Sequence, residues 1–384
     1  MTAAARAGAV LTINLDTIAA NYRRLRDLAG PGIACAAVVK ANAYGLGAPE
    51  VGLKLQAEGC RQFFVATVDE GLMLRHTFED AAPGDVPEIF VLAGPTRTSA
   101  PAFADGWLTP VLNSLEQLGI WRAFAAEAGR PLAGVLHIDT GMSRLGLTPA
   151  DFRQVAGEPS LLDGIVPRLV MSHLACGDEP EHPMNAEQLA AFQDLAALLP
   201  RVPRSLANSA GTLLGRPYRF EMVRPGIALY GPDPFTSRIN NFSECVVLKA
   251  KIIQVRQIDT PQTVGYGATH QAVGPTRIAT VPVGYADGYP RALGNAGFGL
   301  VDGVRVPVVG RVSMDLITLD VSALPPSRCT QDTEVTLLGE GVDIDELADA
   351  AGTIAYEILT HLGQRYHRDY IGAVDPRPRH FARS

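Results

Sequence analysis

The chain has 384 residues, which is more than one hydrophobic core usually holds, so we expect two domains. Apolar residues make up 47% of it and charged residues 19%, a composition typical of a compact globular protein and not of a disordered one. The net charge of −7, with no basic stripe, argues against a nucleic-acid partner.

Signals for export, membrane insertion and metal binding are missing from the sequence. Residues 1–17 lack the continuous apolar segment of a secretory signal, and no apolar run of about 18 residues suggests a membrane span. The five cysteines are scattered and never form a CxxC pair, which favours free thiols over disulfides or a zinc site. We therefore expect a cytoplasmic protein without a bound metal.

Short apolar or β-branched runs alternate with helical patterns between residues 34 and 230. The eight candidate strands are ACAAVVK (34–40), QFFVAT (62–67), EIFVLAG (88–94), LTPVLN (108–113), AGVLHID (133–139), PRLVMSHL (167–174), SLANS (205–209) and RPGIALY (224–230). Helical patterns such as 114–129 and 185–199 lie between them and open on Ser or Asn caps. Eight strand-helix units predict a (β/α)8 barrel of the TIM type, with an open doubly wound sheet as the alternative.

The pattern changes after about residue 238. Strand-like segments then follow one another across Gly, Pro and Asp turns, and helical patterns return only near 343–362. The overall prediction is an α/β protein with a barrel over residues 1–238 and a mainly β domain over residues 239–384. We leave open that about the first 12 residues pack with the second domain.

Active sites of such barrels lie at the carboxyl ends of the strands. This sequence places Lys40, Tyr44, Arg144, His173, Asn208, Ser209 and the segment 224–227 there. Lys40 is notable because the chain has only four lysines. A buried amine favours its neutral form, which can form a Schiff base with an aldehyde, although a lysine that extends to solvent fits the same position.

Two further segments suggest a phosphate site. Ser209 at a helix start offers a hydroxyl and backbone N–H groups, and Gly226 lets the backbone approach an anion closely, although a helix cap and a turn fit these residues equally well. Together with Tyr44 they describe a cradle opposite Lys40, as an aldehyde cofactor that carries a phosphate requires.

The segment AVVKANAYGLGA (37–48) resembles the pyridoxal-phosphate signature of alanine racemases. Further blocks resemble those of the family in the same order: IDTGMSRLG (138–146), SHLACGDE (172–179), ANSAG (207–211), VRPGIALYG (223–231), VGYG (264–267), VGYADGYPR (283–291), GRVSMD (310–315) and AYEIL (355–359). The resemblance implies a barrel followed by a β domain, and a pyridoxal 5'-phosphate-dependent isomerase that interconverts L- and D-alanine and supplies D-alanine for peptidoglycan.

The resemblance also implies a role for each matching residue. Lys40 would hold the cofactor covalently and act as one catalytic base, and Tyr266 would be the second base. Tyr44, Ser209, Gly226, Ile227 and Tyr356 would bind the phosphate. Arg144 would lie near the phenolic oxygen of the cofactor and the substrate carboxylate, the Met314 backbone would also meet substrate, and His173 would support Arg224, which faces the pyridine nitrogen. In the family the tyrosine comes from the partner subunit, so a homodimer is implied.

Two positions depart from the family pattern. Many members have a lysine just before DTGM, reported to be carbamylated and to position the neighbouring arginine, whereas this chain has His137. A water, an anion or His137 itself would then have to support Arg144. The second departure is Ser313, where many members have cysteine.

Three different functions fit parts of the same pattern. A racemase of the same fold with broader amino-acid specificity would share the whole site. A barrel decarboxylase with this cofactor needs a stronger electron sink than the ring that Arg224 would leave. A non-catalytic pyridoxal-phosphate carrier would keep Lys40 but lack the second domain and Tyr266.

Overall fold

The computed structural model describes residues 3–235 and 242–374. By its internal contacts the chain divides into two units. The barrel unit consists mainly of Ile18–Ala43 and Gly47–Phe242, and the β unit consists of Met1–Thr17, Tyr44–Leu46 and Ser243–Ala373. The domain boundary expected between residues 238 and 239 lies outside the described residues.

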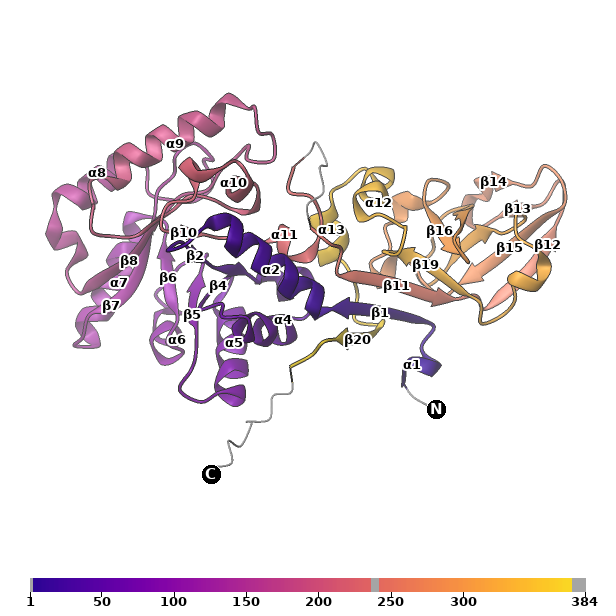
Figure 1. Cartoon of the computed structure of the whole chain (residues 1–384), viewed down its shortest axis with the longest axis horizontal. Helices are drawn as coiled ribbons and strands as arrows, with labels where there is room; N and C mark the ends of the chain where they lie inside the picture. Colours follow the sequence, from indigo (N-terminus) through magenta and orange to yellow (C-terminus); the bar gives the residue numbers. More distant parts are fainter. Residues whose placement is uncertain (1–2, 236–241, 375–384) are drawn as a thin grey trace. The chain divides into compact units, whose positions relative to one another are not determined.

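Parallel strands form the centre of the barrel unit (Figure 1). Seven of them pair in chain order: β3 (Ala37–Val38), β4 (Gln62–Val65), β5 (Glu88–Val91), β6 (Thr109–Leu112), β7 (Leu132–His137), β8 (Ile165–Met171) and β9 (Arg204–Ser205). β2 (Ala34–Cys35) directly precedes β3 and pairs in parallel with β10 (Met222–Val223). The N–H groups of Glu221 and Arg224 donate to the carbonyls of Arg204 and Ala207, which joins β10 to the β9 segment as well. The strands therefore close into the predicted barrel, and the open-sheet alternative is wrong.

Helices connect these strands. They are α2 (Leu15–Ala29), α4 (Ala48–Ala57), α5 (Val68–Ala81), α6 (Ala100–Asp105), α7 (Leu115–Glu127), α8 (Pro149–Gly157), α9 (Pro183–Ala196), α10 (Ser209–Leu213) and α11 (Ile227–Tyr230). Ser114 caps α7 as expected. α9 begins earlier than its expected Asn cap, because Pro183 suits the first helical position and the His182 ring accepts a hydrogen bond from the Met184 N–H.

The expected strand over residues 224–230 is wrong. The strand ends at Val223, and Ile227–Tyr230 forms the helix α11. Pro225 has no N–H to donate to a neighbouring strand, and the Gly226 N–H donates instead to the Ser209 hydroxyl. The apolar run that suggested a strand is a buried helical turn, so the predicted element type is wrong although the segment still follows the last strand.

The barrel interior is a packed hydrophobic core and not a channel. Its members come from successive strands: Ala36, Phe64, Phe90, Val111, Val135, Leu169, Met171 and Met222. The rings of Phe64 and Phe90 stack with their centroids 4.7 Å apart. Because side chains fill the interior, a ligand has access only to the ends of the strands.

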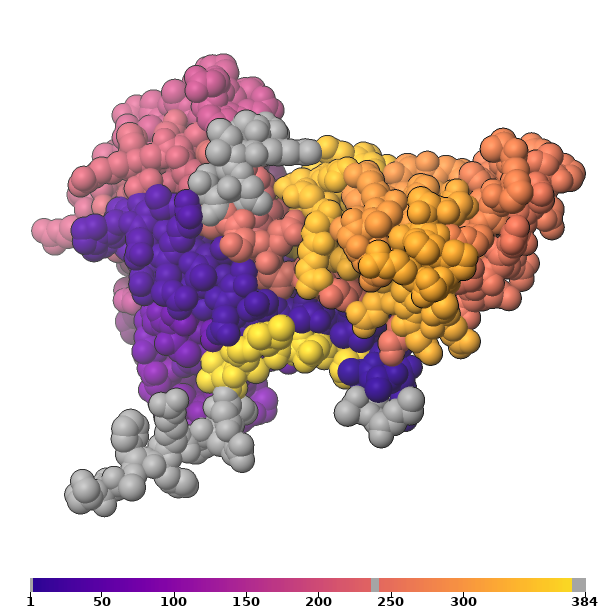
Figure 2. All heavy atoms as spheres, turned by 45° about the vertical axis from the view of Figure 1, so that its right-hand side comes forward, coloured from indigo at the N-terminus to yellow at the C-terminus, as the bar shows by residue number. Residues whose placement is uncertain are grey.

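The β unit contains a six-stranded sheet in the order β17-β16-β19-β11-β1-β20. These strands are β17 (Val304–Pro307), β16 (Phe298–Val301), β19 (Glu334–Leu338), β11 (Val246–Lys251), β1 (Ala9–Asn14) and β20 (His367–Ile371). β1 pairs antiparallel with β11 and parallel with β20. Figure 1 and Figure 2 both show the yellow β20 segment beside the indigo β1 segment.

The remaining elements of the β unit are short. β12 (Gln254–Ile258), β15 (Thr276–Val281) and β18 (Ile317–Asp320) form a second sheet, and β13 (Thr263–Val264) pairs with β14 (His270–Gln271). Two α-helices, α12 (Ile344–Ala351) and α13 (Ala355–Thr360), lie between β19 and β20 in the chain, and α1 (Ala3–Arg6) precedes β1. Across the two described ranges no helix combines the length and the apolar character needed to cross a membrane.

Gly45, next to Tyr44, tests how closely this segment packs against α13. Its φ is +85°, and a Cβ atom there would lie 2.3 Å from the Leu359 carbonyl oxygen of α13. We expect Gly45→Ala to destabilise the protein by about 2 kcal/mol or more, because backbone atoms cannot rotate away from the added methyl. Urea unfolding followed by circular dichroism measures the loss.

The matched control is Gly32→Ala. Gly32 has a similar φ of +79° but nothing within 4 Å of the added Cβ, so only the left-handed strain of about 1 kcal/mol remains. If both substitutions lowered the free energy of unfolding equally, the contact of Gly45 with α13 would contribute nothing to stability.

Candidate active site

The carboxyl ends of the barrel strands gather the cationic residues that the sequence singled out. Lys40 follows β3, Arg144 lies in the loop after β7, and His173 follows β8. His173 is partly buried, and Arg224, Arg144, Lys40 and His137 all add to the effect of burial in lowering its pKa to about 3. The mouth of the barrel thus places Lys40 and two arginines around a histidine that stays neutral.

Lys40 lies in an environment that favours its neutral form. Burial lowers the pKa of its amine, the charge of Arg144 lowers it further, and Glu70 acts in the opposite direction. A neutral amine is the nucleophilic form that carbonyl chemistry requires. The environment therefore supports a chemical role for Lys40 over that of a lysine extended into solvent.

The backbone that follows Lys40 is unusual. α3 (Lys40–Tyr44) is a left-handed turn in which residues 41–44 all have φ between 52° and 55°. L-residues in this region cost roughly 1–2 kcal/mol each, so the turn needs external support. The Ala43 N–H donates to the Val39 carbonyl at 2.8 Å, and the Asn42 side-chain oxygen accepts the N–H of Ala48 at 2.9 Å.

Arg224 is a buried cation that hydrogen-bonds to neutral groups. Its guanidinium donates to the Ser205 hydroxyl and, at 2.6 Å, to the Ser172 carbonyl, and it lies 5.8 Å from the centre of the Phe64 ring. Within residues 3–235 and 242–374 no carboxylate lies at salt-bridge distance from it. Burial lowers the pKa of Arg224 to about 9, which still leaves it charged at neutral pH. A ligand with a lone pair or a negative charge would complement it.

Ser209 lies where the starts of two short helices meet. It is the first residue of α10, and its hydroxyl oxygen accepts the N–H groups of Gly226 at 2.9 Å and Ala228 at 3.3 Å. Because the oxygen accepts both bonds, its proton remains for a ligand acceptor. Ile227, the first residue of α11, follows Gly226 directly. This set of donors suits a phosphate group.

The other four predicted site residues belong to the β unit by their contacts. The rings of Tyr44 and Tyr356 lie with centroids 6.0 Å apart, and burial raises the pKa of Tyr44, so its phenol keeps a proton to donate. Tyr266 is 74% exposed and lines a cavity of about 600 Å³ together with Arg311. Met314 is 54% exposed. The structure thus brings Tyr44 and Tyr356 together and leaves Tyr266 open to solvent.

His137 is held in one protonation state by Asn113. The Asn113 amide nitrogen donates to the carbonyls of Leu92 and Val111, both at 3.0 Å, so its oxygen must face the His137 Nδ1 at 2.8 Å. Nδ1 therefore carries the proton. Burial lowers the pKa of His137 to about 4, so the ring is neutral and its Nε2 can accept a hydrogen bond at neutral pH.

The loop that carries Arg144 is attached to His137 directly. The Leu147 N–H donates to the His137 carbonyl at 2.7 Å, and a cavity of about 410 Å³ is lined by Asn113, Asp139 and Arg144 among others. The His137 carbonyl thus anchors the end of the loop that carries Arg144.

Two residues near the site were missed from the sequence. Asn113 ends a predicted strand, and Glu70 stands three residues after Thr67 in a pattern that signals only a helix start. Their second contacts, to His137 and to the Ala41 N–H, join segments 24 and 29 positions apart. The spacing along one sequence carries no signal for such contacts.

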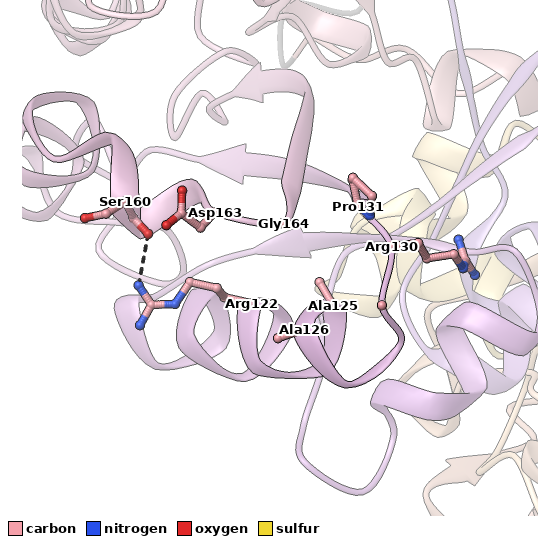
Figure 3. A pocket seen from close by; sticks show the side chains of 9 residues that line it. Arg122, Ala125, Ala126, Arg130, Pro131, Ser160, Asp163 and Gly164 are labelled. Carbon is pink, nitrogen blue, oxygen red and sulfur yellow. Dashed lines mark hydrogen bonds between the residues drawn. The ribbon is translucent and has the colours of Figure 1, made fainter.

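A further cavity of about 540 Å³ lies at the opposite ends of the strands. Pro131, directly before β7, and Gly164, directly before β8, line it, and Arg122 donates to the Ser160 carbonyl across it (Figure 3). Its lining contains no lysine, cysteine, histidine or tyrosine. Barrel enzymes work at the other end, so this cavity is not the candidate active site.

Comparison with known proteins covers nearly the whole chain. Residues 13–234 match the family model "Alanine racemase, N-terminal domain", and residues 245–370 match "Alanine racemase, C-terminal domain". The chain is 51% identical to the alanine racemase of Rhodospirillum rubrum, over 96% of this chain and 97% of that protein. It is 49% identical to the catabolic alanine racemase of Mesorhizobium japonicum, over 96% and 94%. The crystal structure of alanine racemase from Bartonella henselae with covalently bound pyridoxal phosphate superposes with a TM-score of 0.90 at 38% identity, over 95% of this chain and 100% of that one.

The two histidines with lowered pKa values predict how stability depends on pH. The pKa of His137 is about 4 in the folded protein and about 6.5 in an unfolded chain, so between these values the unfolded state binds more protons and acid favours unfolding. We expect the cofactor-free protein to lose thermal stability as the pH falls through this window. His137→Gln should reduce this loss in scanning calorimetry.

The control is His76→Gln. The His76 side chain is 78% exposed, so its removal should leave the pH dependence unchanged. A His137→Gln protein with the same acid sensitivity as the parent would contradict the buried neutral state of His137.

Proposed function

This chain belongs to the alanine racemase family, and on that premise we propose that it interconverts L- and D-alanine with Lys40 and Tyr266 as its two proton-transferring groups. It is a pyridoxal-phosphate-dependent isomerase. The observation that carries the residue assignment is the half-buried amine of Lys40 at the barrel mouth, whose neutral form is favoured by burial and by the charge of Arg144. We infer that the product supplies D-alanine for peptidoglycan and that the enzyme acts in the cytoplasm.

The residues present fit the cofactor. Pyridoxal phosphate, when bound, supplies the electron-withdrawing ring that makes the Cα proton of alanine acidic. The Lys40 amine would hold its aldehyde carbon. The phosphate would receive the Ser209 hydroxyl proton, the N–H groups of Gly226 and Ile227, and the phenols of Tyr44 and Tyr356, whose rings are neighbours. Arg224 would donate to the pyridine nitrogen, assisted by His173.

Racemisation requires a proton to leave one face of Cα and another to arrive at the opposite face. Lys40 supports one of these transfers because its neutral form is favoured. A phenol is a poor base at neutral pH, so Tyr266 needs a nearby cation to act as one, and we assign this role to Arg144. Arg144 also binds the substrate carboxylate, and the Met314 backbone contacts the substrate.

We propose that Tyr266 reaches the site from the partner subunit of a homodimer. Its side chain is 74% exposed and stands beside an open cavity, and Met314 and Leu316 of the same region are also exposed. Exposed apolar groups of this kind suit burial against a second copy of the chain.

The charge of Arg224 separates this enzyme from a decarboxylase. Arginine does not release its proton at neutral pH, so the pyridine nitrogen beside it remains an acceptor and the ring a weaker electron sink than a carboxylate partner would make. With the cofactor bound, Arg224 would therefore favour return of a proton to Cα over transamination. Release of carbon dioxide from an amino acid would contradict this role of Arg224.

Substrate tests distinguish an alanine racemase from a broad-specificity racemase and from a cofactor carrier. A racemase of broad specificity would turn over serine, lysine or arginine as fast as alanine. A non-catalytic carrier would bind the cofactor but leave the optical rotation of L-alanine unchanged, and the β unit with Tyr266 speaks against it.

Removal of the Tyr266 hydroxyl tests its role in proton transfer. For Tyr266→Phe we expect kcat/KM to fall by about 100-fold or more in both directions, because the equilibrium constant ties the two values together and one proton donor is lost. Racemisation of each enantiomer in deuterated water, followed by circular dichroism and mass spectrometry, measures the loss. Tyr218→Phe is the control for loss of a phenol elsewhere, and full activity of Tyr266→Phe would remove its assigned role.

Mixing two inactive variants tests the contribution across the dimer. If Tyr266 serves the partner's Lys40, a heterodimer of Lys40→Ala and Tyr266→Phe chains has one doubly defective site and one intact site. Statistical mixing should therefore restore about a quarter of the parent activity. If Tyr266 serves its own chain, no site is intact and mixing restores nothing.

A further inference from the structure

The carboxylate of Glu70, in the first turn of α5, accepts hydrogen bonds from two separate segments. One oxygen accepts the N–H groups of Ala66 at 2.7 Å and Thr67 at 3.3 Å, and Thr67 in turn accepts the Glu70 N–H, which completes a capping box. The other oxygen accepts the N–H of Ala41 at 2.7 Å. This last bond lies outside the helix cap and joins α5 to the residue that follows Lys40.

The capping box does not need this additional bond. α8 begins with the same arrangement, in which Asp151 accepts the N–H and the hydroxyl of Thr148 and the Thr148 side chain accepts the Asp151 N–H. Within the described residues, Asp151 accepts no hydrogen bond from another segment. The bond from Ala41 to Glu70 is therefore a separate feature with its own consequence.

The consequence of this bond is that it sets the direction in which the Lys40 side chain leaves the backbone. The Ala41 N–H belongs to the peptide that joins Lys40 to the left-handed turn, so the bond to Glu70 fixes the plane of that peptide. A turn with four left-handed residues is not stable by itself. A charge-assisted bond at its first peptide counters the tendency of the backbone to relax and to move the Lys40 side chain.

Glu70 also changes the electrostatic environment of the amine. The charged groups that act on Lys40 are Glu70 from α5 and Arg144 from the loop after β7. The charge of Lys40 in turn helps to lower the pKa of His173, which follows β8. Arg144 repels a proton on the amine, whereas the Glu70 carboxylate attracts it. A proton-transferring lysine must both release and accept a proton, so it requires a balance between these two charges.

We propose that Glu70 is the positioning residue of Lys40: its carboxylate closes the turn that begins at the lysine and supplies the negative charge that lets the amine carry a proton. This inference rests on the proposed role of Lys40 in proton transfer. Glu70 acts through Lys40 and contacts neither substrate nor cofactor in this assignment.

The low number of lysines makes the charge effect measurable. Competitive acylation of the cofactor-free full-length chain at a series of pH values, read by mass spectrometry, reports the protonation midpoint of Lys40 with Lys54, Lys249 and Lys251 as internal standards. Glu70→Gln should move the Lys40 midpoint to lower pH, because the attracting charge is lost, and leave the other three unchanged. Asp151→Asn, which weakens the matching capping box, should move none of them.

Amide hydrogen exchange tests the positioning effect in the same proteins. Glu70→Gln should speed exchange of the peptide that contains Ala41 by about tenfold or more, the size expected for loss of a hydrogen bond to a charged group. Asp151→Asn should not. If Glu70→Gln does not fold, Glu70→Asp replaces it; this variant keeps the charge, so faster Ala41 exchange with a retained Lys40 midpoint supports the proposal.

Unchanged exchange at Ala41 in the Glu70 variant, or an unchanged Lys40 midpoint in Glu70→Gln, would overturn the proposal. Neither readout depends on turnover of alanine. A chain that fails to racemise alanine but shows both shifts would therefore refute the proposed function and leave the link between Glu70 and Lys40 intact.

Discussion

Positive charge held out of water at the end of the barrel is the constraint on which the rest of the site depends. Arg224 is almost wholly buried and hydrogen-bonds to a hydroxyl and to carbonyl groups, and Lys40 and Arg144 act on the same region. Arg144 is exposed and Lys40 is half-buried, so electrostatic repulsion is most costly at the buried Arg224. The surrounding groups reduce it: His137 and His173 stay uncharged, and Glu70 adds a negative charge. An anion bound beside Arg224 would complete this arrangement.

The need to limit positive charge also explains why this chain has His137 where many family members have a lysine. A lysine there would add a fourth cation unless its amine were modified, whereas a neutral imidazole adds an acceptor without charge. Asn113 makes this replacement work, because its amide is held by two carbonyl groups and can only present its oxygen to the ring. In this chain hydrogen-bond geometry thus sets the protonation state of the histidine.

Much of the fold could be predicted from the sequence, because barrel strands are short apolar runs and each helix that follows has its own cap and period. Lys40 could be placed at a strand end for the same reason. The eighth strand was misplaced, because Ile227–Tyr230 is apolar enough for either a buried strand or a buried helix, and the hydrogen bond from Gly226 to Ser209 that decides between them joins residues 17 apart. Glu70 and Asn113 were missed because their functional contacts lie between segments. The roles of Tyr266 and Met314 came from the family resemblance, since an exposed tyrosine in a turn has no distinctive pattern of its own.

The sheet of the β unit also constrains how this enzyme is made. β1, among the first elements of the chain, pairs with β11 and with β20, which is the last described strand. During synthesis the strands of the barrel leave the ribosome in an order that lets each one pair with its predecessor, whereas β1 must wait for partners about 240 and 360 residues later. The barrel can thus begin to form during translation, but the sheet that organises the unit carrying Tyr266 is completed only when β20 has been released. A product truncated before β20 would retain the barrel strands around Lys40 but would lack one strand of the sheet in the unit that carries Tyr266. The pairing of β1 with β20 therefore makes completion of that sheet depend on synthesis of nearly all of the described chain.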